Sequence, residues 1–276
     1  MSNFSSDALP REDETSPLPE AASSPLQGVP LGSDSALVQA YQQQYDLPKS
    51  DAFLRWRRLA ARTKAMNVVE MAGGQSFEKV LEVGCGDGSI LRFLSEQGFA
   101  KALYGCDISV TAVNQAKSQE IPSLAEAIVF DGYHLPYPDG FFDLAYCSHV
   151  VEHVEYPRAL IREIGRVSKQ QVYEIPIDFG FYVDKKVNHF CGYGHINIFT
   201  PALFRFLLFS EGYSLIREKC GFFGSDFVRA NFSGKPLAKW LFRFKSLMIS
   251  SIPYLRGIKP NYYCLLVQKT GDLKTL

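Results

Sequence analysis

The sequence lacks paired cysteines, a long apolar run and a net charge. Its six cysteines form no C-x-x-C pair and have no regular spacing, which excludes a disulfide framework and is typical of reduced thiols in an intracellular protein. The N-terminal residues have no apolar core such as a signal peptide needs, and no run of about 18 apolar residues predicts a spanning helix. We therefore expect a cytoplasmic protein.

Opposite charges balance over the whole chain but are unevenly placed. The 29 Lys and Arg residues match the 29 Asp and Glu residues, which argues against the basic character of a nucleic-acid-binding protein. Residues 1–34 are acidic, whereas residues 227–271 contain Lys and Arg but neither Asp nor Glu.

Composition divides the chain into three parts. Residues 1–34 are rich in Ser, Pro, Asp and Glu and have few large apolar groups, so we expect a disordered acidic tail. Residues 35–74 show helical periodicity and predict an N-terminal helical cap that ends at Gly73-Gly74. Residues 75–276 form the main domain, with an insertion over residues 221–260 between its last two strands.

From Lys79 onward, short apolar strands alternate with helical segments. This alternation is typical of right-handed β-α-β units and predicts a doubly wound, mostly parallel α/β sheet covered on both faces. The final two strands need no crossover helix if they form an antiparallel pair. The expected strands are Val80–Val83, Ala102–Cys106, Ala127–Phe130, Phe142–Cys147, Gln171–Ile175, Ser214–Lys219 and Tyr262–Gln268.

A glycine-rich turn, Gly84-Cys-Gly86-Asp-Gly88, follows the first strand and opens a helix. Gly84 permits the sharp turn, Gly86 lets the backbone approach a ligand, and Gly88 lets the helix pack close to the strand. The helix that follows offers free N–H groups to a carboxylate. The G-x-G-x-G spacing is shorter than the G-x-G-x-x-G of dinucleotide-binding proteins, which disfavours a nicotinamide dehydrogenase.

Two acidic residues follow the next two strands. Asp107 ends the second strand, where a carboxylate can accept hydrogen bonds from ribose hydroxyls, and Asp131 follows the third, where it can accept from an adenine amine. The carboxyl ends of parallel strands meet at one sheet edge, so the turn and both acids predict a nucleoside crevice there.

The chain resembles the class I S-adenosylmethionine-dependent methyltransferases, in the small-molecule branch related to the ubiquinone and menaquinone C-methyltransferases. The matching pieces are LEVGCGDG, YGCDIS, DGYHLPYPDGFFDLAYCSHVVEHV and, more weakly, GHINIFT. The resemblance implies a seven-stranded sheet of order 3-2-1-4-5-7-6 with the seventh strand antiparallel, and S-adenosyl-L-methionine as cofactor.

The resemblance also implies the residues that bind the cofactor. Gly84 and Gly86 hold the methionine part, Asp107 holds the ribose, Asp131 and Gly132 contact the adenine, and Ser148 lies near the sulfonium. Glu82 either contacts the methionine amino group or is a buried structural acid. The full predicted set is Glu82, Gly84, Gly86, Asp107, Ile108, Asp131, Gly132 and Ser148.

Histidines are the candidate catalytic residues, because methyl transfer needs a base only when the acceptor must lose a proton. We take His149 and His195 as candidates, and His195 has the alternative of holding its loop. For Glu152-His153, at a predicted helix start, we favour packing over an acid/base pair. Since no Asp, His and Cys residues have metal-ligand spacing, we expect no catalytic metal.

Three aromatic segments are expected to shape the acceptor site. Residues 178–199 should form one wall, and Tyr41, Tyr45 and Trp56 belong to the cap, where a ring beside the sulfonium would be favourable. Residues 236–253 predict an amphipathic helix that either packs as a lid or rests on an anionic membrane.

These features predict an enzyme that moves the methyl group of S-adenosylmethionine to an O, N or C nucleophile of a small or lipid-linked acceptor. The alternative is a methyltransferase-like module that binds the cofactor without turnover. Nucleic acid is disfavoured as a partner, because the chain has no Asn/Asp-Pro-Pro-Tyr motif and its basic residues cluster only in the late insertion. The sequence leaves the acceptor and the oligomeric state open.

Overall fold

The computed structural model describes residues 39, 42–43, 45–46, 49–179, 183, 186–192, 194–222, 237, 240–241, 244, 247 and 260–274. Within them, seven strands form one sheet of order β3-β2-β1-β4-β5-β7-β6, which confirms the predicted order. The elements, in chain order, are α2 (Asp51–Ala72), β1 (Phe77–Val83), α3 (Ser89–Glu96), β2 (Ala100–Asp107), α4 (Val110–Ser118), β3 (Leu124–Val129), β4 (Phe142–Ser148), α5 (Pro157–Val167), β5 (Ser168–Pro176), α6 (Val187–Gly192), α7 (Pro201–Ser210), β6 (Tyr213–Gly221) and β7 (Tyr262–Lys269).

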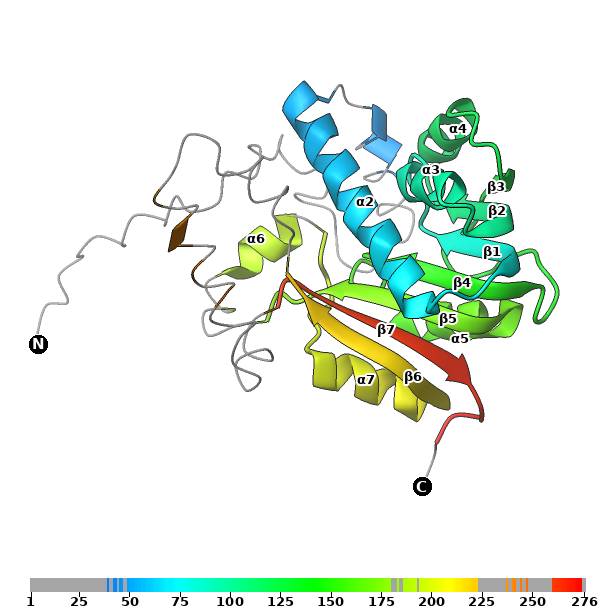
Figure 1. Ribbon diagram of the computed structural model, residues 1–276. Coiled ribbons are helices and arrows are strands. Elements are labelled where there is room, and N and C mark those ends of the chain that lie inside the picture. Colours follow the sequence, from blue (N-terminus) through cyan, green and yellow to red (C-terminus); the bar gives the residue numbers. More distant parts are fainter. Residues whose placement is uncertain are drawn as a thin grey trace, which may run out of the picture.

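The sheet is parallel except at β7, which pairs antiparallel with both β5 and β6 (Figure 1). The predicted strands are all present, but most are longer by one to three residues at an end. The edge strand β3 begins at Leu124 rather than Ala127, because Leu124 and Glu126 still pair with β2 across a register shift. The expected loop after β5 contains the short helix α6, which the sequence analysis did not predict.

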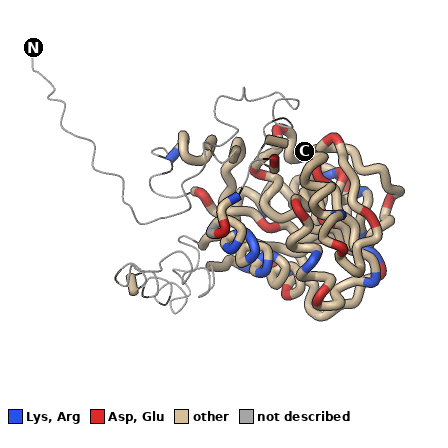
Figure 2. The backbone as a smooth tube through the Cα atoms, turned by 90° about the horizontal axis from the view of Figure 1, so that it is seen from above, with Lys and Arg blue, Asp and Glu red and all other residues tan. Residues whose placement is uncertain are grey.

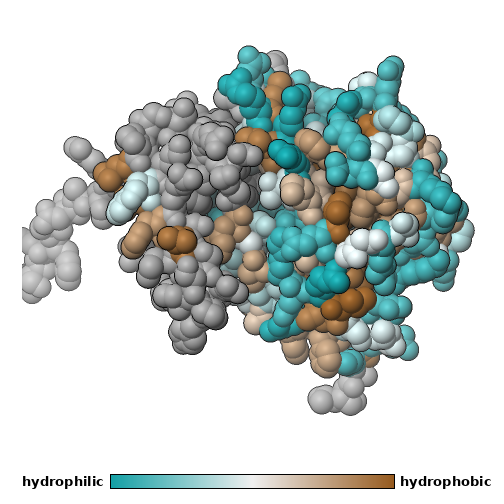
Figure 3. Space-filling model, in the orientation of Figure 1, coloured by the Kyte–Doolittle hydropathy of each residue, from teal (hydrophilic) through white to brown (hydrophobic). Residues whose placement is uncertain are grey.

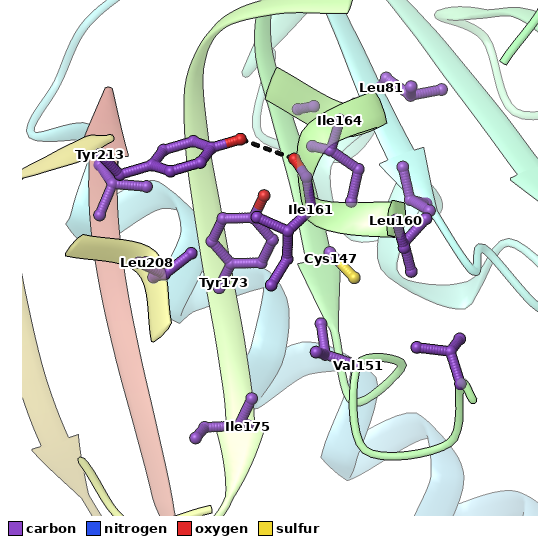
Figure 4. Packing of buried hydrophobic residues seen from close by; sticks show 14 of the residues in the cluster. Leu81, Cys147, Val151, Leu160, Ile161, Ile164, Tyr173, Ile175, Leu208 and Tyr213 are labelled. Carbon is purple, nitrogen blue, oxygen red and sulfur yellow. Dashed lines mark hydrogen bonds between the residues drawn. The ribbon is translucent and has the colours of Figure 1, made fainter. Parts of the chain in front are cut away.

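Helices cover both faces of the sheet, as the doubly wound prediction requires (Figure 1). Side chains of α2 and α3 pack with the sheet in one apolar cluster, and those of α5 and α7 pack in a second. In the second cluster, Ile161 and Ile164 of α5 lie over Tyr173 of β5, and the Tyr213 hydroxyl donates a hydrogen bond to the Ile161 carbonyl at 2.6 Å (Figure 4). Burying each large aliphatic side chain contributes about 1.5–3 kcal/mol, so these two layers hold the sheet in place.

Local sequence signals set the ends of the helix that covers the site. The Ser50 side chain accepts a hydrogen bond from the Phe53 N–H at the start of α2, and Gly73 closes the helix in the left-handed conformation. On the opposite face, Glu211 joins α7 to α5. Its buried carboxylate accepts hydrogen bonds from Arg158 at 2.5 Å and from Arg162 at 2.6 Å.

The described surface carries an apolar region over α7 and β6 and a group of basic side chains on α2. Lys and Arg are grouped on α2, which has no Asp or Glu between Asp51 and Glu70, and both charge signs are interspersed over the rest of the described chain (Figure 2). Exposed apolar side chains of α7 and β6 form the apolar region, seen low in the body in Figure 3. These residues are Leu203, Phe206, Phe209, Leu215 and Ile216. This region lies on the antiparallel side of the sheet, away from the strand ends at which the predicted polar residues cluster.

Candidate functional site

The carboxyl ends of β1, β2 and β4 lie side by side at one edge of the sheet. Val83 of β1 pairs with Cys106 of β2 on one side and with Cys147 of β4 on the other. The next residue of each strand therefore reaches the same edge. The sheet register thus brings Gly84, Asp107 and Ser148 together.

The glycine-rich turn between β1 and α3 needs its glycines for steric reasons. Gly84 has φ +75°, and a Cβ there would lie 2.3 Å from the Val150 Cγ2 atom. Gly86 has φ +54°, and its Cβ would lie 2.5 Å from the Tyr45 hydroxyl. Gly88 is the N-cap of α3 and faces Ala116 of α4, so it permits close helix–helix packing rather than the helix–strand packing expected.

Asp107 couples the glycine turn to the end of β2. Its Oδ2 atom accepts a hydrogen bond from the Gly86 N–H at 2.8 Å, and its Oδ1 atom accepts one from the Ser109 N–H at 2.9 Å. Burial raises the pKa of Asp107, and these two hydrogen bonds partly offset that rise. The carboxylate is therefore fixed in orientation at the strand end where a ribose acceptor was predicted.

The cap lies over the glycine turn through Tyr45 and Arg57. The Arg57 guanidinium donates a hydrogen bond to the Tyr45 hydroxyl at 3.0 Å, stacks on that ring at 4.9 Å, and pairs with Asp87 at 3.2 Å. Burial raises the pKa of Tyr45, so the phenol is neutral. Of the other cap aromatics, Trp56 lies against Phe53 on α2, and Tyr41 is outside the described residues.

Asp131 holds its own turn together after β3. Its Oδ1 atom accepts hydrogen bonds from the Tyr133 and His134 N–H groups, and its Oδ2 atom lies 2.7 Å from the His134 Nδ1 atom. Both side chains are more than half exposed. A Cβ on Gly132 would lie 3.6 Å from the Ile108 Cγ2 atom. Thus Ile108 and Gly132, both predicted to be cofactor-binding, are neighbours here.

Glu82 and Ser148 are buried at the same strand ends. The Tyr146 hydroxyl donates a hydrogen bond to the Glu82 carboxyl at 2.7 Å, and burial raises the pKa of Glu82 well above its usual value. This partner supports the reading of Glu82 as a buried structural acid. The Ser148 hydroxyl is buried without a hydrogen-bond partner among the described residues, so a polar ligand atom could satisfy it.

His149 follows β4 in a strained conformation between two buried glutamates. It has φ +56°, which is rare for a residue with a side chain. Its Nε2 atom lies 3.2 Å from Glu174, and its Nδ1 atom lies 3.5 Å from Glu152. Asn67 of α2 donates a second hydrogen bond to Glu174 at 2.7 Å. Neither Glu174 nor Asn67 was predicted as a site residue; the acid within the apolar run VYEIP was the available signal.

The Glu152-His153 pair lies in a turn, which corrects the expected helix start. Helix α5 begins only at Pro157, which favours the first helical position, and residues 151–153 form the turn before it. The His153 Nδ1–H group donates a hydrogen bond to the Gly194 carbonyl at 2.9 Å. Burial lowers the pKa of His153 well below its usual value. The pair is therefore tied to the segment that contains His195.

The protein-family model named methyltransferase domain matches residues 81–173, which span β1 to β5 and contain every strand end described above. The chain contains a class I S-adenosylmethionine-dependent methyltransferase domain. The domain is 33% identical over 93 residues to ajmaline N-methyltransferase of Rauvolfia serpentina, covering 32% of each protein. It is 33% identical over 92 residues to demethylmenaquinone methyltransferase of Corynebacterium kroppenstedtii, covering 33% of this chain and 38% of that protein. The match thus spans about a third of these relatives' length.

Solved structures share the methyltransferase fold over a longer stretch. A putative methyltransferase solved with the Haloferax volcanii Trm112 activator has a TM-score of 0.60 and 14% identity, covering 88% of this chain and all of that one. Magnesium protoporphyrin IX methyltransferase from Synechocystis, solved with S-adenosylhomocysteine, has a TM-score of 0.56 and 15% identity, covering 86% of this chain and all of that one. At these identities the likeness establishes the fold alone.

Members of this methyltransferase family use S-adenosylmethionine, and the residues at the strand ends fit it. Asp107 presents an oriented carboxylate, Gly86 has no Cβ to block the approach to the turn, and the Ser148 hydroxyl lacks a partner among the described residues. No helix in the described part of the chain is long and apolar enough to cross a membrane.

Proposed function

We propose that the chain transfers the methyl group of S-adenosylmethionine to an O, N or C nucleophile of a small or lipid-linked acceptor. The observation that supports this most directly is the Asp107 carboxylate, bonded to the Gly86 N–H where β1, β2 and β4 end side by side. That arrangement joins a methionine-binding turn to a ribose acceptor. The named relatives, which include an N-methyltransferase and a demethylmenaquinone methyltransferase, support a small-molecule acceptor.

On the donor side, we assign Asp107 to the ribose and Gly84 and Gly86 to the methionine part. Asp131, Gly132 and Ile108 would contact the adenine. Ser148 and Glu82 would lie near the sulfonium and the methionine part. The bound cofactor supplies an already activated methyl group. The chain would contribute orientation and exclusion of water, with the Tyr45 ring, held by Arg57, covering the turn.

On the acceptor side, His149 and His195 stay predictions as catalytic residues. Both ring nitrogens of His149 face buried carboxylates, so His149 can take an acceptor proton only by giving up one of these contacts. The His195 Nδ1 atom lies 2.5 Å from Asp178, which orients the ring. His149→Asn would separate the roles: a fall in kcat with unchanged affinity for S-adenosylhomocysteine supports catalysis, and a matched loss of affinity supports a structural role.

An exposed apolar helix face supports the lipid-linked option. Of residues 236–253, the structure describes five, and each side chain is more than half exposed. The Trp240 and Phe244 rings stack 5.5 Å apart. These exposures favour contact with a lipid surface or a lipid-like acceptor over the packed-lid alternative. The five residues are Leu237, Trp240, Leu241, Phe244 and Leu247.

The test is a methyl-transfer assay on mixed acceptors. Metabolite and lipid extracts are incubated with the full chain and isotopically labelled S-adenosylmethionine, and labelled products are identified by mass spectrometry. A labelled product that depends on the protein and disappears with Asp107→Ala supports the proposal. Binding of S-adenosylmethionine without any labelled product, across extracts that cover the chain's own source, would favour the alternative of a binding module. Binding of NAD instead would overturn both.

A further inference from the structure

Two segments far apart in the sequence are joined by backbone hydrogen bonds beside the strand ends. The Glu152 carbonyl accepts hydrogen bonds from the N–H groups of Ile196 and Asn197, both at 3.0 Å. The Asn197 side chain also donates to the Val154 carbonyl at 2.7 Å. The turn after β4 and the segment before α7 are therefore held in register, which fixes the distance between Glu152-His153 and His195.

Each of the two imidazoles in this region is oriented through its Nδ1 atom. A carbonyl only accepts, so the His153 Nδ1 atom that bonds Gly194 carries the proton, and Nε2 bears the lone pair in the neutral ring. The His195 Nδ1 atom lies 2.5 Å from the Asp178 carboxylate. The two rings meet edge to face, 4.8 Å apart. In protein metal sites, ligand histidines are typically held in this way, by a carbonyl or carboxylate on the other nitrogen.

The Glu152 carboxylate is buried where these rings meet. Its side chain is 1% exposed, and neither oxygen has a hydrogen-bond partner among the described residues. Four basic side chains act on it: His149, with Nδ1 at 3.5 Å, His153, with Nε2 at 3.7 Å, and the nearby His195 and Lys64. The two distances to His149 and His153 are beyond good hydrogen-bond length. A buried carboxylate in this state is costly unless a cation satisfies it.

We propose that Glu152, His153 and His195 bind a divalent transition-metal ion of the zinc class, with Asp178 and the Gly194 carbonyl holding the two histidines in place. One ligand atom from each residue lies within 4.8 Å of the other two. A tetrahedral zinc ion holds its ligand atoms about 3.4 Å apart, so small side-chain rotations bring the three into coordination.

The donor set determines which ion the site would take. Two imidazoles and one carboxylate suit Zn²⁺, Fe²⁺, Mn²⁺ or Co²⁺, whereas Ca²⁺ and Mg²⁺ prefer oxygen ligands alone. Three protein ligands leave a coordination position open, which is the pattern of catalytic rather than structural zinc sites. The site goes beyond the proposed methyl transfer, because binding of the donor at Asp107 and Gly86 does not involve these residues. It differs from the expectation of no metal, which rested on sequence spacing alone.

The experiment measures metal binding by the full chain directly. Protein stripped with a chelator is titrated with Zn²⁺ alone and with Co²⁺ alone, and bound metal is counted by elemental analysis. We expect one ion per chain at micromolar concentration or below. The Co²⁺ spectrum should lack sulfur-to-metal charge transfer, because the exposed cysteines Cys191 and Cys220 are not among the ligands.

Single variants identify the ligands. Glu152→Gln and His195→Gln should each weaken binding at least about 100-fold, and Asp178→Asn by about 10–100-fold, the usual effect of losing a residue that orients a ligand. His189→Gln is the matched control, since His189 is an exposed histidine of the same segment and should bind metal as the wild type does. Binding of S-adenosylhomocysteine by each variant shows that it is folded, independently of the metal.

The site would be overturned by binding only at millimolar metal, or by binding that persists in Glu152→Gln and His195→Gln. Loss of binding in His189→Gln or Cys191→Ser alone would also overturn it, because the ion would then lie elsewhere. If the ligand variants fail to fold, X-ray absorption of the zinc-loaded wild type decides. Scattering from two imidazoles with no sulfur neighbour supports the site, and a sulfur shell refutes it.

Discussion

Replacing Asp107 by Ala should weaken cofactor binding about 100-fold. In the proposed complex the ribose hydroxyls lose a charged acceptor, and each hydrogen bond to a charged group contributes about 1.5–3 kcal/mol. A total loss of about 3 kcal/mol corresponds to about two orders of magnitude in Kd. The same substitution leaves the buried N–H groups of Gly86 and Ser109 without their acceptor. At about 1–3 kcal/mol for each of the two groups, the free energy of unfolding should also fall, by about 2–6 kcal/mol.

The stability loss requires a control that removes a carboxylate of similar structural role. Asp143, at the start of β4, accepts hydrogen bonds from the backbone N–H groups of Glu78 and Lys79 and pairs with Lys169. It lies at the opposite edge of the sheet, because β4 runs from Phe142 to Ser148. Asp143→Ala should therefore cost comparable stability and leave cofactor affinity unchanged.

The assay is calorimetric titration of S-adenosylhomocysteine, which binds without turnover, at a temperature where both variants are folded by circular dichroism. The ribose assignment is refuted if Asp107→Ala retains affinity within about threefold of wild type, well below the roughly 100-fold loss expected from two charged hydrogen bonds. An equal loss of affinity in Asp143→Ala would refute the reasoning differently. It would show that affinity follows global stability rather than the carboxylate at the end of β2.

Three further predictions follow from contacts elsewhere. Gly84→Ala places a Cβ 2.3 Å from the Val150 side chain at a positive φ, so it should lower the free energy of unfolding by about 2–4 kcal/mol. In chemical denaturation of the double variant, Val150→Ala should restore the part of this loss that comes from the clash, but not the part that comes from the positive φ. Burial raises the pKa of Glu211, but its two arginine partners on α5 lower it by more, so the pKa is below its usual value of 4.5. The wild type should therefore be more stable than Glu211→Gln by about 1–3 kcal/mol at neutral pH, and this difference should disappear as the pH falls below about 4.5 and through the lowered pKa. A constant advantage across that range in thermal melts would contradict the ion pairing. Trp240→Ser with Phe244→Ser should reduce co-sedimentation with anionic vesicles by about 10–100-fold if the exposed face contacts lipid, and an unchanged bound fraction would exclude that contact.

The fold follows from local pattern because each signal in it is short-range. The apolar run at β1, the glycine turn and the amphipathic α3 form one β-α unit, and repetition of that unit predicts the sheet. Strand ends were less predictable, because pairing extends a strand into polar residues, as at Glu126 in β3. The helix α6 gave no periodic signal within its aromatic and glycine-rich surroundings. Tertiary packing decides such boundaries.

The strand ends that bring the glycine turn and Asp107 together were predictable for the same reason, since Gly84 directly follows β1 and Asp107 ends β2. The cluster behind them was not. Glu174 becomes a partner of His149 only through the pairing of β4 with β5, and Asn67 reaches it from α2, a helix outside the β-α repeat. Neither contact has a fixed sequence spacing. Only the three-dimensional arrangement shows that these side chains surround one histidine.

The contrast is sharpest at Glu152-His153. A metal-ligand search by spacing looks for side chains one helical turn apart, and an adjacent pair fails that criterion because neighbouring side chains on a helix diverge. The pair lies in a turn instead, where its Glu152 carbonyl receives the N–H groups of Ile196 and Asn197 and so brings His195 to the same point. The motif GHIN therefore has a physical reason beyond family resemblance: its glycine carbonyl orients His153, and its asparagine fastens the segment to Val154. A backbone contact, which no side-chain pattern encodes, makes a three-ligand site out of two unrelated sequence segments.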